Sequence, residues 1–292
     1  MVKRRRKSSG RLLWGTGGAV GVVVVAVVLA VILSSSGPQQ LYFGPTSPTI
    51  LAQLQGVPAS VYDTVGVNSP GIATNPLESL ANLGITKAQP ALTYTVGGKT
   101  LPGVLYVGAD YCPYCGATRW GIITALTRFG TFNTLYNMLS SANDVYPSTP
   151  TFSFAGKKPT EVVKYTSKYF VFTPYETLDR NEGNFMLPPA NVQTLINSYD
   201  ISSLGTGGIP FLDVGNRYFI TGSEYDPAAL ASSSRSQIAA DLNQPSVPVT
   251  QAIISVANYV SAAICSITKS QPATVCHSSG VLAAAGVMKI KL

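Results

Sequence analysis

The chain has 292 residues, which is enough for one large domain or two small ones. Only 11% of its residues are charged, and its formal net charge is +7. Six of its 20 basic residues lie in residues 1–34, which hold no acidic residue, so residues 35–292 carry 14 basic and 13 acidic side chains. Because the body of the chain is nearly neutral and lacks a basic stripe interleaved with aromatic residues, the sequence does not support a nucleic-acid partner.

An uncharged apolar run follows the basic N-terminus. It covers 22 residues, 12–33, and a helix of that length is about 33 Å long, enough to cross a hydrocarbon core of about 30 Å. We therefore predict one transmembrane anchor at residues 12–34, with residues 1–11 in the cytoplasm and the rest of the chain outside the cell membrane. A cleaved secretory signal is the alternative, but its apolar region is usually shorter. Both interpretations export the remaining residues.

The exported part divides into two regions by composition. Prolines and glycines recur after a serine-rich start in residues 35–60, which is typical of a tether. Further prolines interrupt weakly helical pieces up to residue 90. We predict a tether and irregular lead-in over residues 35–90 and one folded domain over residues 91–292.

The spacing of apolar residues predicts alternating strands and helices in this domain. The predicted strands are 92–96, 104–108, 151–155, 168–173 and a hairpin at 209–221. The predicted helices are 115–130, 132–142, 189–199, 226–242 and 249–267. The last helix carries polar residues among its apolar positions, so we expect a core helix and not a second membrane span. This order is typical of an α/β fold, with a mostly helical insertion before the hairpin.

Cys112 and Cys115, separated by Pro113 and Tyr114, lie between a predicted strand and a predicted helix. Proline suits the first helical turn, so the first cysteine is expected at the helix N-terminus. Unpaired N–H groups and the helix dipole stabilise a thiolate there, and the thiolate is the form that attacks disulfides. We assign Cys112 as the nucleophile and Cys115 as the resolving thiol. Asp110 would oppose thiolate formation if it pointed inward.

Other interpretations of these cysteines remain open from the residues alone. A static disulfide, or half of a zinc site completed by distant ligands, would use the same pair. Cys265 and Cys276 are expected to form a structural disulfide that closes a short loop, or else a relay pair that exchanges electrons with the first. Three further residues have plainer expectations: His277 on the surface, and Arg119 and Arg128 on the solvated face of the helix.

The cysteine motif and its flanks resemble the active-site stretch of the thioredoxin superfamily. More closely, the chain resembles a family of membrane-anchored, thioredoxin-like prokaryotic proteins that carry a domain of unknown function. The resemblance extends over roughly residues 60–280 and is carried by these segments: 104–115, 128–132, 144–147, 149–154, 165–169, 209–210 and 262–265.

The resemblance implies a thioredoxin-like fold with a helical insertion and extra C-terminal helices, as in disulfide-forming periplasmic oxidoreductases. It also implies that Pro210 is cis and packs beside the cysteine pair, with Ile209 pairing to a substrate peptide and Pro113 and Tyr114 next to it. The residues alone give Pro210 a plainer interpretation, an edge-strand proline with a trans bond.

The function expected from these features is extracytoplasmic thiol–disulfide exchange on exported protein thiols or disulfides. A redox partner, which the membrane could supply, would restore the pair, and no cofactor or metal is expected. The alternative is a non-catalytic, membrane-anchored module for binding or assembly. The direction of electron flow depends on a reduction potential that the sequence does not set.

Overall fold

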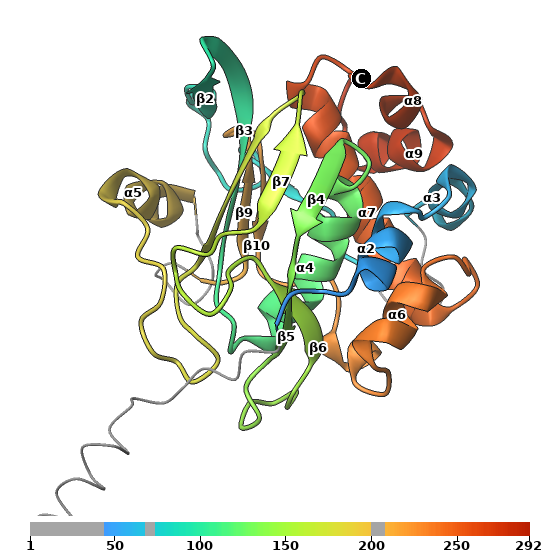
Figure 1. The fold of residues 1–292 in the computed structure, drawn as a ribbon. Helices are drawn as coiled ribbons and strands as arrows, with labels where there is room; N and C mark the ends of the chain where they lie inside the picture. The colour runs from blue at the N-terminus through green and yellow to red at the C-terminus, as the bar shows by residue number, and fades with distance from the viewer. Residues whose placement is uncertain (1–43, 68–73, 200–207) are drawn as a thin grey trace, which may run out of the picture. The chain divides into compact units, whose positions relative to one another are not determined.

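A computed structural model describes residues 44–67, 74–199 and 208–292. The predicted cytoplasmic N-terminus and membrane anchor, residues 1–34, lie outside the described residues. The fold is mixed α/β, built on a central mixed sheet (Figure 1).

The central strand of this sheet is β3, Lys99–Gly108. β3 pairs antiparallel with β2, Thr93–Val96, through residues 99–102, and one side of its residues 103–108 pairs parallel with β8, Val171–Glu176. On its other side the described residues continue the sheet antiparallel through β9 (Phe211–Val214), β10 (Tyr218–Thr221) and β1 (Glu78–Ser79). The predicted hairpin at 209–221 is therefore confirmed as β9 and β10.

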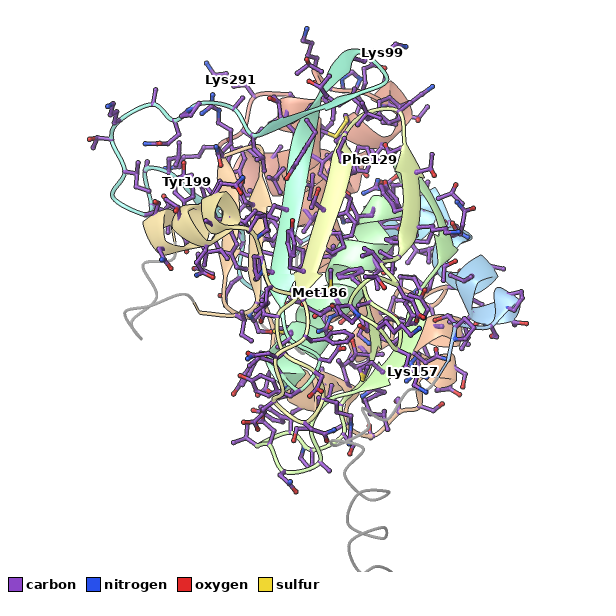
Figure 2. The ribbon with its side chains drawn as sticks, turned by 60° about the vertical axis from the view of Figure 1, so that its left-hand side comes forward. Lys99, Phe129, Lys157, Met186, Tyr199 and Lys291 are labelled. Carbon is purple, nitrogen blue, oxygen red and sulfur yellow. A yellow bond between two sulfur atoms is a disulfide. The ribbon has the colours of Figure 1, made fainter. Side chains whose placement is uncertain are left out.

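Helices cover both faces of the sheet (Figure 1). One face packs on α4, Pro113–Leu126, and α7, Pro248–Ile267. The other face packs on α5, Ala190–Tyr199, whose Tyr199 is labelled in Figure 2. Because strand 104–108 lies between these two layers, its side chains are buried on both faces, as the sequence predicts.

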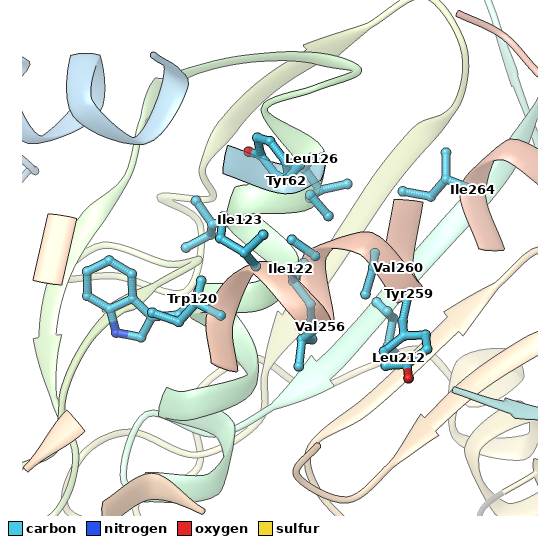
Figure 3. Close-up of a cluster of buried hydrophobic side chains, with 14 of the residues drawn as sticks. Tyr62, Trp120, Ile122, Ile123, Leu126, Leu212, Val256, Tyr259, Val260 and Ile264 are labelled. Carbon is cyan, nitrogen blue, oxygen red and sulfur yellow. The ribbon is translucent and has the colours of Figure 1, made fainter. Parts of the chain in front are cut away.

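α4 and α7 pack closely in the core (Figure 3). A Cβ added at Gly121 of α4 would lie 2.4 Å from Cγ1 of Val256, so only glycine allows this approach. Within the described residues, α7 is the one helix long and apolar enough to cross a membrane, with a mean hydropathy of 1.4. However, 83% of its most apolar 18-residue stretch is buried inside the domain, which fits the predicted core helix.

The segment inserted between α4 and β8 differs from the prediction. Residues 127–170 are all described, and their regular elements are strands, which agrees with the strand predicted at 151–155 but not with the helix predicted at 132–142: β4 (Gly130–Thr134), β5 (Tyr136–Leu139), β6 (Pro150–Ser153) and β7 (Lys164–Ser167). The helix predicted at 132–142 is wrong. Phe132, Leu135 and Met138 are buried at a three-residue spacing that imitates a helix. Pairing of β4 with β7 and of β5 with β6 overrides that local pattern.

Part of the predicted tether is folded. α2, Pro48–Gln55, and α3, Ala59–Val65, fall inside residues 35–90, and both bury apolar side chains in the core. Pro48 occupies the first turn of α2, and Pro58 precedes the first residue of α3. These prolines therefore begin helices, which is a position that proline favours, instead of marking an extended linker.

The C-terminal part is helical, with different boundaries from those predicted. The helix expected at 226–242 is a short 3-10 turn followed by one short helix. The elements here are η1 (Pro227–Leu230), α6 (Arg235–Asp241), α8 (Ala273–Cys276) and α9 (Ser279–Val287).

Candidate functional site

Cys112 is the N-cap residue of α4 and follows β3 after a short connection. Its backbone is extended, with φ −76° and ψ 120°, and Pro113 begins the helix behind it. The Sγ of Cys112 accepts a hydrogen bond from the backbone N–H of Cys115, with 3.2 Å between N and S. The sulfur therefore takes the place of the oxygen that a serine or aspartate would supply at this position.

The two thiols have opposite electrostatic environments. A hydrogen bond from the Cys115 side chain lowers the pKa of Cys112, and the Cys115 N–H and the charge of Arg119 add to this against the effect of burial. Burial raises the pKa of Cys115 well above its ordinary value, and the bond to Cys112 raises it further. Because the thiolate is the nucleophile, Cys112 is the cysteine suited to attack, and Cys115 is favoured to stay a protonated thiol.

Other predicted site residues surround this pair. Cys112, Cys115 and Ala109 form a small buried cluster, against which Ile209 packs. The Ile209–Pro210 peptide bond is cis. Two more residues pack against the cluster: Tyr111, which directly precedes Cys112, and Leu178, which follows β8 in the chain. Pro113 is buried and Tyr114 is 39% exposed, so Tyr114 is the member of the motif that faces outward.

Arg119 is buried below the cysteines, and its predicted place on a solvated face is wrong. Its Nε and Nη2 donate to the two carboxylate oxygens of Glu176, at 2.8 and 2.6 Å. Nη2 also donates to the carbonyl of Ala109 at 2.7 Å and lies 3.5 Å from Oδ1 of Asp110. A possible signal was present in the sequence, because Arg119 is the only charged residue in α4.

Tyr106 lies in the same interior region. The guanidinium carbon of Arg119 is 5.8 Å from the centre of its ring. Burial raises the pKa of Tyr106 well above its ordinary value, and Arg119 opposes this. Within the described part of the chain, neither the Tyr106 hydroxyl nor Nη1 of Arg119 has a hydrogen-bond partner. Buried polar groups therefore lie beneath the cysteine pair.

Cys265 and Cys276 form a disulfide with an S–S distance of 1.97 Å. It lies near the far end of α4, where the guanidinium of Arg128 donates to the Ser278 hydroxyl at 2.9 Å. Between Cys112 and the turn that holds Arg128 lie the 14 residues of α4, which correspond to about 21 Å of helix. Direct exchange needs sulfur atoms in contact, so this geometry does not support a relay between the two pairs.

Arg128 is also largely buried, contrary to its predicted solvated position. It donates to Oδ1 of Asn258 and to the Ser261 hydroxyl, both at 3.1 Å, and its guanidinium carbon is 4.1 Å from the Tyr62 ring centre. His277 is exposed beside the disulfide. Across the described ranges, no three His, Cys, Asp or Glu residues are placed to hold a metal ion.

The fold and site define a mixed α/β domain with a cysteine pair at the start of a core helix. A family model described as a domain of unknown function (DUF929) matches residues 90–266, more than half of the chain. The protein belongs to this family. No curated protein matches the chain, and no solved structure does.

Proposed function

We propose that this protein is a membrane-anchored thiol–disulfide oxidoreductase that acts outside the cytoplasm on the thiols or disulfides of exported proteins. The observation that carries this proposal is the asymmetry of the cysteine pair. Cys112 caps the helix and has a lowered pKa, whereas Cys115 is fully buried behind it with a raised pKa. This is the division into attacking and resolving sulfur that exchange chemistry requires.

The topology supports membership of the thioredoxin superfamily. The chain runs from β3 through α4 to β8, which is parallel to β3, and then through α5 to the antiparallel hairpin β9–β10 and α7. A thioredoxin fold has this order, with a cis-proline before the hairpin and the cysteine pair after the first strand. Ile209 and Pro210 occupy that cis-proline position, and Ile209 packs against the cysteine cluster.

The proposed reaction balances in sulfur, electrons and protons. The Cys112 thiolate attacks one sulfur of a substrate disulfide, forms a mixed disulfide and releases the other substrate sulfur as a thiolate, which takes up a proton. Cys115 then loses its proton and attacks Cys112, which releases the second substrate thiol. The substrate disulfide is reduced and the Cys112–Cys115 pair is oxidised. The reverse sequence oxidises a substrate dithiol and leaves the pair reduced. A redox partner then returns the pair to its starting state, as a reductant after substrate reduction or as an oxidant after substrate oxidation.

The extracytoplasmic location rests on the basic and apolar N-terminal residues, together with the second cysteine pair. Disulfides persist in oxidising compartments, and the Cys265–Cys276 disulfide suits such a compartment. The proposed arrangement is a single membrane pass at 12–34, with the domain outside.

Insulin-reduction and dithiol-oxidation assays on the purified full-length protein test the proposal. We expect exchange activity in the wild type, loss of activity in Cys112→Ser, and a trapped mixed disulfide in Cys115→Ser. A matched control is Cys265→Ser combined with Cys276→Ser, which should keep activity. Equal rates in the wild type and Cys112→Ser would refute the proposal.

One observation favours a second candidate, a non-catalytic binding or assembly module. Cys112 is only 6% exposed, so its sulfur is poorly accessible to a large partner. This candidate predicts that a small alkylating reagent labels Cys112 far more slowly than it labels an exposed thiol, and that a Cys112–Cys115 disulfide resists mild reductant. Rapid labelling of Cys112 would contradict this second candidate.

A further inference from the structure

The loop between β5 and β6, residues 140–149, is bonded to the start of α4. We call it the hairpin loop. The N–H of Ser141 donates to the carbonyl of Tyr111, the residue before the first cysteine, at 2.8 Å. At the base of the loop, the hydroxyl of Thr151 donates to the carbonyl of Gly116 in α4 at 2.8 Å. These bonds hold the loop beside the cysteine pair, at the end of the molecule where α4 begins (Figure 1).

The hairpin loop is also closed on itself. The N–H of Ser140 donates to the carbonyl of Thr149 at 3.0 Å, and the N–H of Thr149 donates back to the Ser140 hydroxyl at 2.9 Å. The N–H of Ser148 donates to the carbonyl of Ser141 at 2.8 Å. These hydrogen bonds close the base of the loop and therefore fix the position of its tip, residues 142–147.

The tip carries apolar and aromatic side chains that are not buried. Val145 is 71% exposed. The ring of Tyr146 meets the ring of Tyr114 edge to face, with centroids 5.7 Å apart and an interplanar angle of 87°. Because Tyr114 lies between the two cysteines, the Tyr114–Tyr146 pair lies next to the reactive sulfur, and the exposed Val145 precedes Tyr146 in the chain. We call Tyr114, Val145 and Tyr146 the aromatic rim.

The near-burial of Cys112 gives the aromatic rim a role. Contacts outside the cysteine pair that hold a protein substrate in place raise the rate at which its sulfur reaches Cys112. Tyrosine supplies a large, stiff contact area with little loss of side-chain entropy, and exposed apolar surface beside a site is typical of an interaction surface. Ile209 flanks the pair as well, and an extended peptide beside it would project successive side chains in alternate directions.

We propose that the aromatic rim binds an aromatic or aliphatic side chain of the substrate. That side chain lies beside the substrate's own reacting cysteine, in an extended segment of an exported protein. This inference rests on the proposed function and adds the substrate preference to it. The inserted β5–β6 hairpin is then a specificity element, and the core of the fold supplies the chemistry.

The experiment uses the full-length protein and three substrates. Two are synthetic peptide disulfides that differ only in phenylalanine or serine beside the cysteine, and the third is hydroxyethyl disulfide, which has no peptide. Tyr146→Ala should raise KM for the phenylalanine peptide roughly two- to tenfold, the value of one aromatic contact. It should leave the serine peptide and the small disulfide unchanged. Tyr146→Phe should keep the preference, and Leu282→Ala, an exposed leucine on α9, should change nothing.

The outcomes separate this inference from the proposed function. Equal losses on all three substrates in Tyr146→Ala would show that the loop only supports the fold and would overturn the inference. An unchanged ratio of KM values between the two peptides would also overturn it, with the proposed function intact. A wild type that exchanges with none of the substrates, hydroxyethyl disulfide included, would refute the proposed function itself.

Discussion

The guanidinium of Arg119 and the carboxylate of Glu176 meet in the interior through two hydrogen bonds of 2.8 and 2.6 Å. Neither side chain is exposed to solvent. Arg119 belongs to the helix that begins at the cysteine pair, and Glu176 is the last residue of β8. The same carboxylate accepts the N–H of Phe154 at 3.1 Å. One buried ion pair therefore joins the cysteine helix, the central sheet and the inserted strands.

The Arg119–Glu176 pair should be costly to break but cheaper to replace. Glu176→Leu or Arg119→Met alone leaves a buried charge without its main partner, and each should lower the free energy of unfolding by about 3–5 kcal/mol. Arg119→Met with Glu176→Leu should lose clearly less than the sum, because both charges leave together. Denaturant unfolding measures the three values, and strictly additive losses would contradict the coupling.

Arg119 should also control the reactivity of Cys112, because its positive charge favours the thiolate. Arg119→Met should raise the pKa of Cys112, whereas Arg119→Lys keeps the charge and should restore most of the wild-type value. The pH dependence of Cys112 alkylation measures this. Arg128→Met, just beyond the other end of α4, is the matched control and should leave the profile unchanged. A profile that did not move in Arg119→Met would show that Arg119 only supports the fold.

Asp213 should make the protein less stable as the pH rises. Burial raises the pKa of Asp213 from 3.8 to about 7. Between these values the folded protein holds a proton that the unfolded chain has released, so the free energy of unfolding falls with rising pH and levels off above about 7. The free energy of unfolding falls by a few kcal/mol in total, on the order of 1.4 kcal/mol for each unit by which the pKa is raised. Glu224, whose pKa burial raises to about 8, contributes in the same direction.

Asp213→Asn tests this pH dependence. Its side-chain oxygen can still accept the Asn216 N–H, which lies 2.6 Å from Oδ1 of Asp213. The drop in the free energy of unfolding between about pH 5 and about pH 8 should be smaller in this variant than in the wild type. Asp226→Asn, at an exposed position, is the control. Parallel curves for the wild type and Asp213→Asn would mean that Asp213 does not cause the slope.

Removing the Cys265–Cys276 disulfide should affect stability and leave exchange unaffected. The two cysteines are 11 residues apart, and closing a loop of that size contributes about 3 kcal/mol. Replacing both by alanine should lower the free energy of unfolding by roughly that amount and keep the exchange rate of the Cys112–Cys115 pair. A rate that fell together with the disulfide, while the protein stayed folded, would favour the relay role after all.

Local patterns predict the parts of the fold that depend on near neighbours. The strand at 104–108, α5, the hairpin of β9 and β10, and the long helix α7 all follow from apolar spacing and turn residues. The helix start at Cys112 follows from the proline behind it. Nothing in these stretches needed a distant partner to decide between helix and strand.

The wrong predictions concern residues whose structure depends on distant partners. β4 and β5 pair with strands that follow later in the chain, and this outweighs the helical spacing of Phe132 and Leu135. Arg119 is the same kind of case, because a charge on a helix is solvated unless a remote carboxylate such as Glu176 is brought to it. Neither partner can be identified from the residues around it.

The sequence by itself determined the α/β character of the domain and the start of the core helix at Cys112, because short-range backbone preferences and apolar spacing decide both. Only the tertiary structure placed the buried Arg119–Glu176 pair under the two thiols and the hairpin loop beside them. Those features arise from contacts between residues far apart in the chain, whose distances and burial exist only once the sheet and helices have packed.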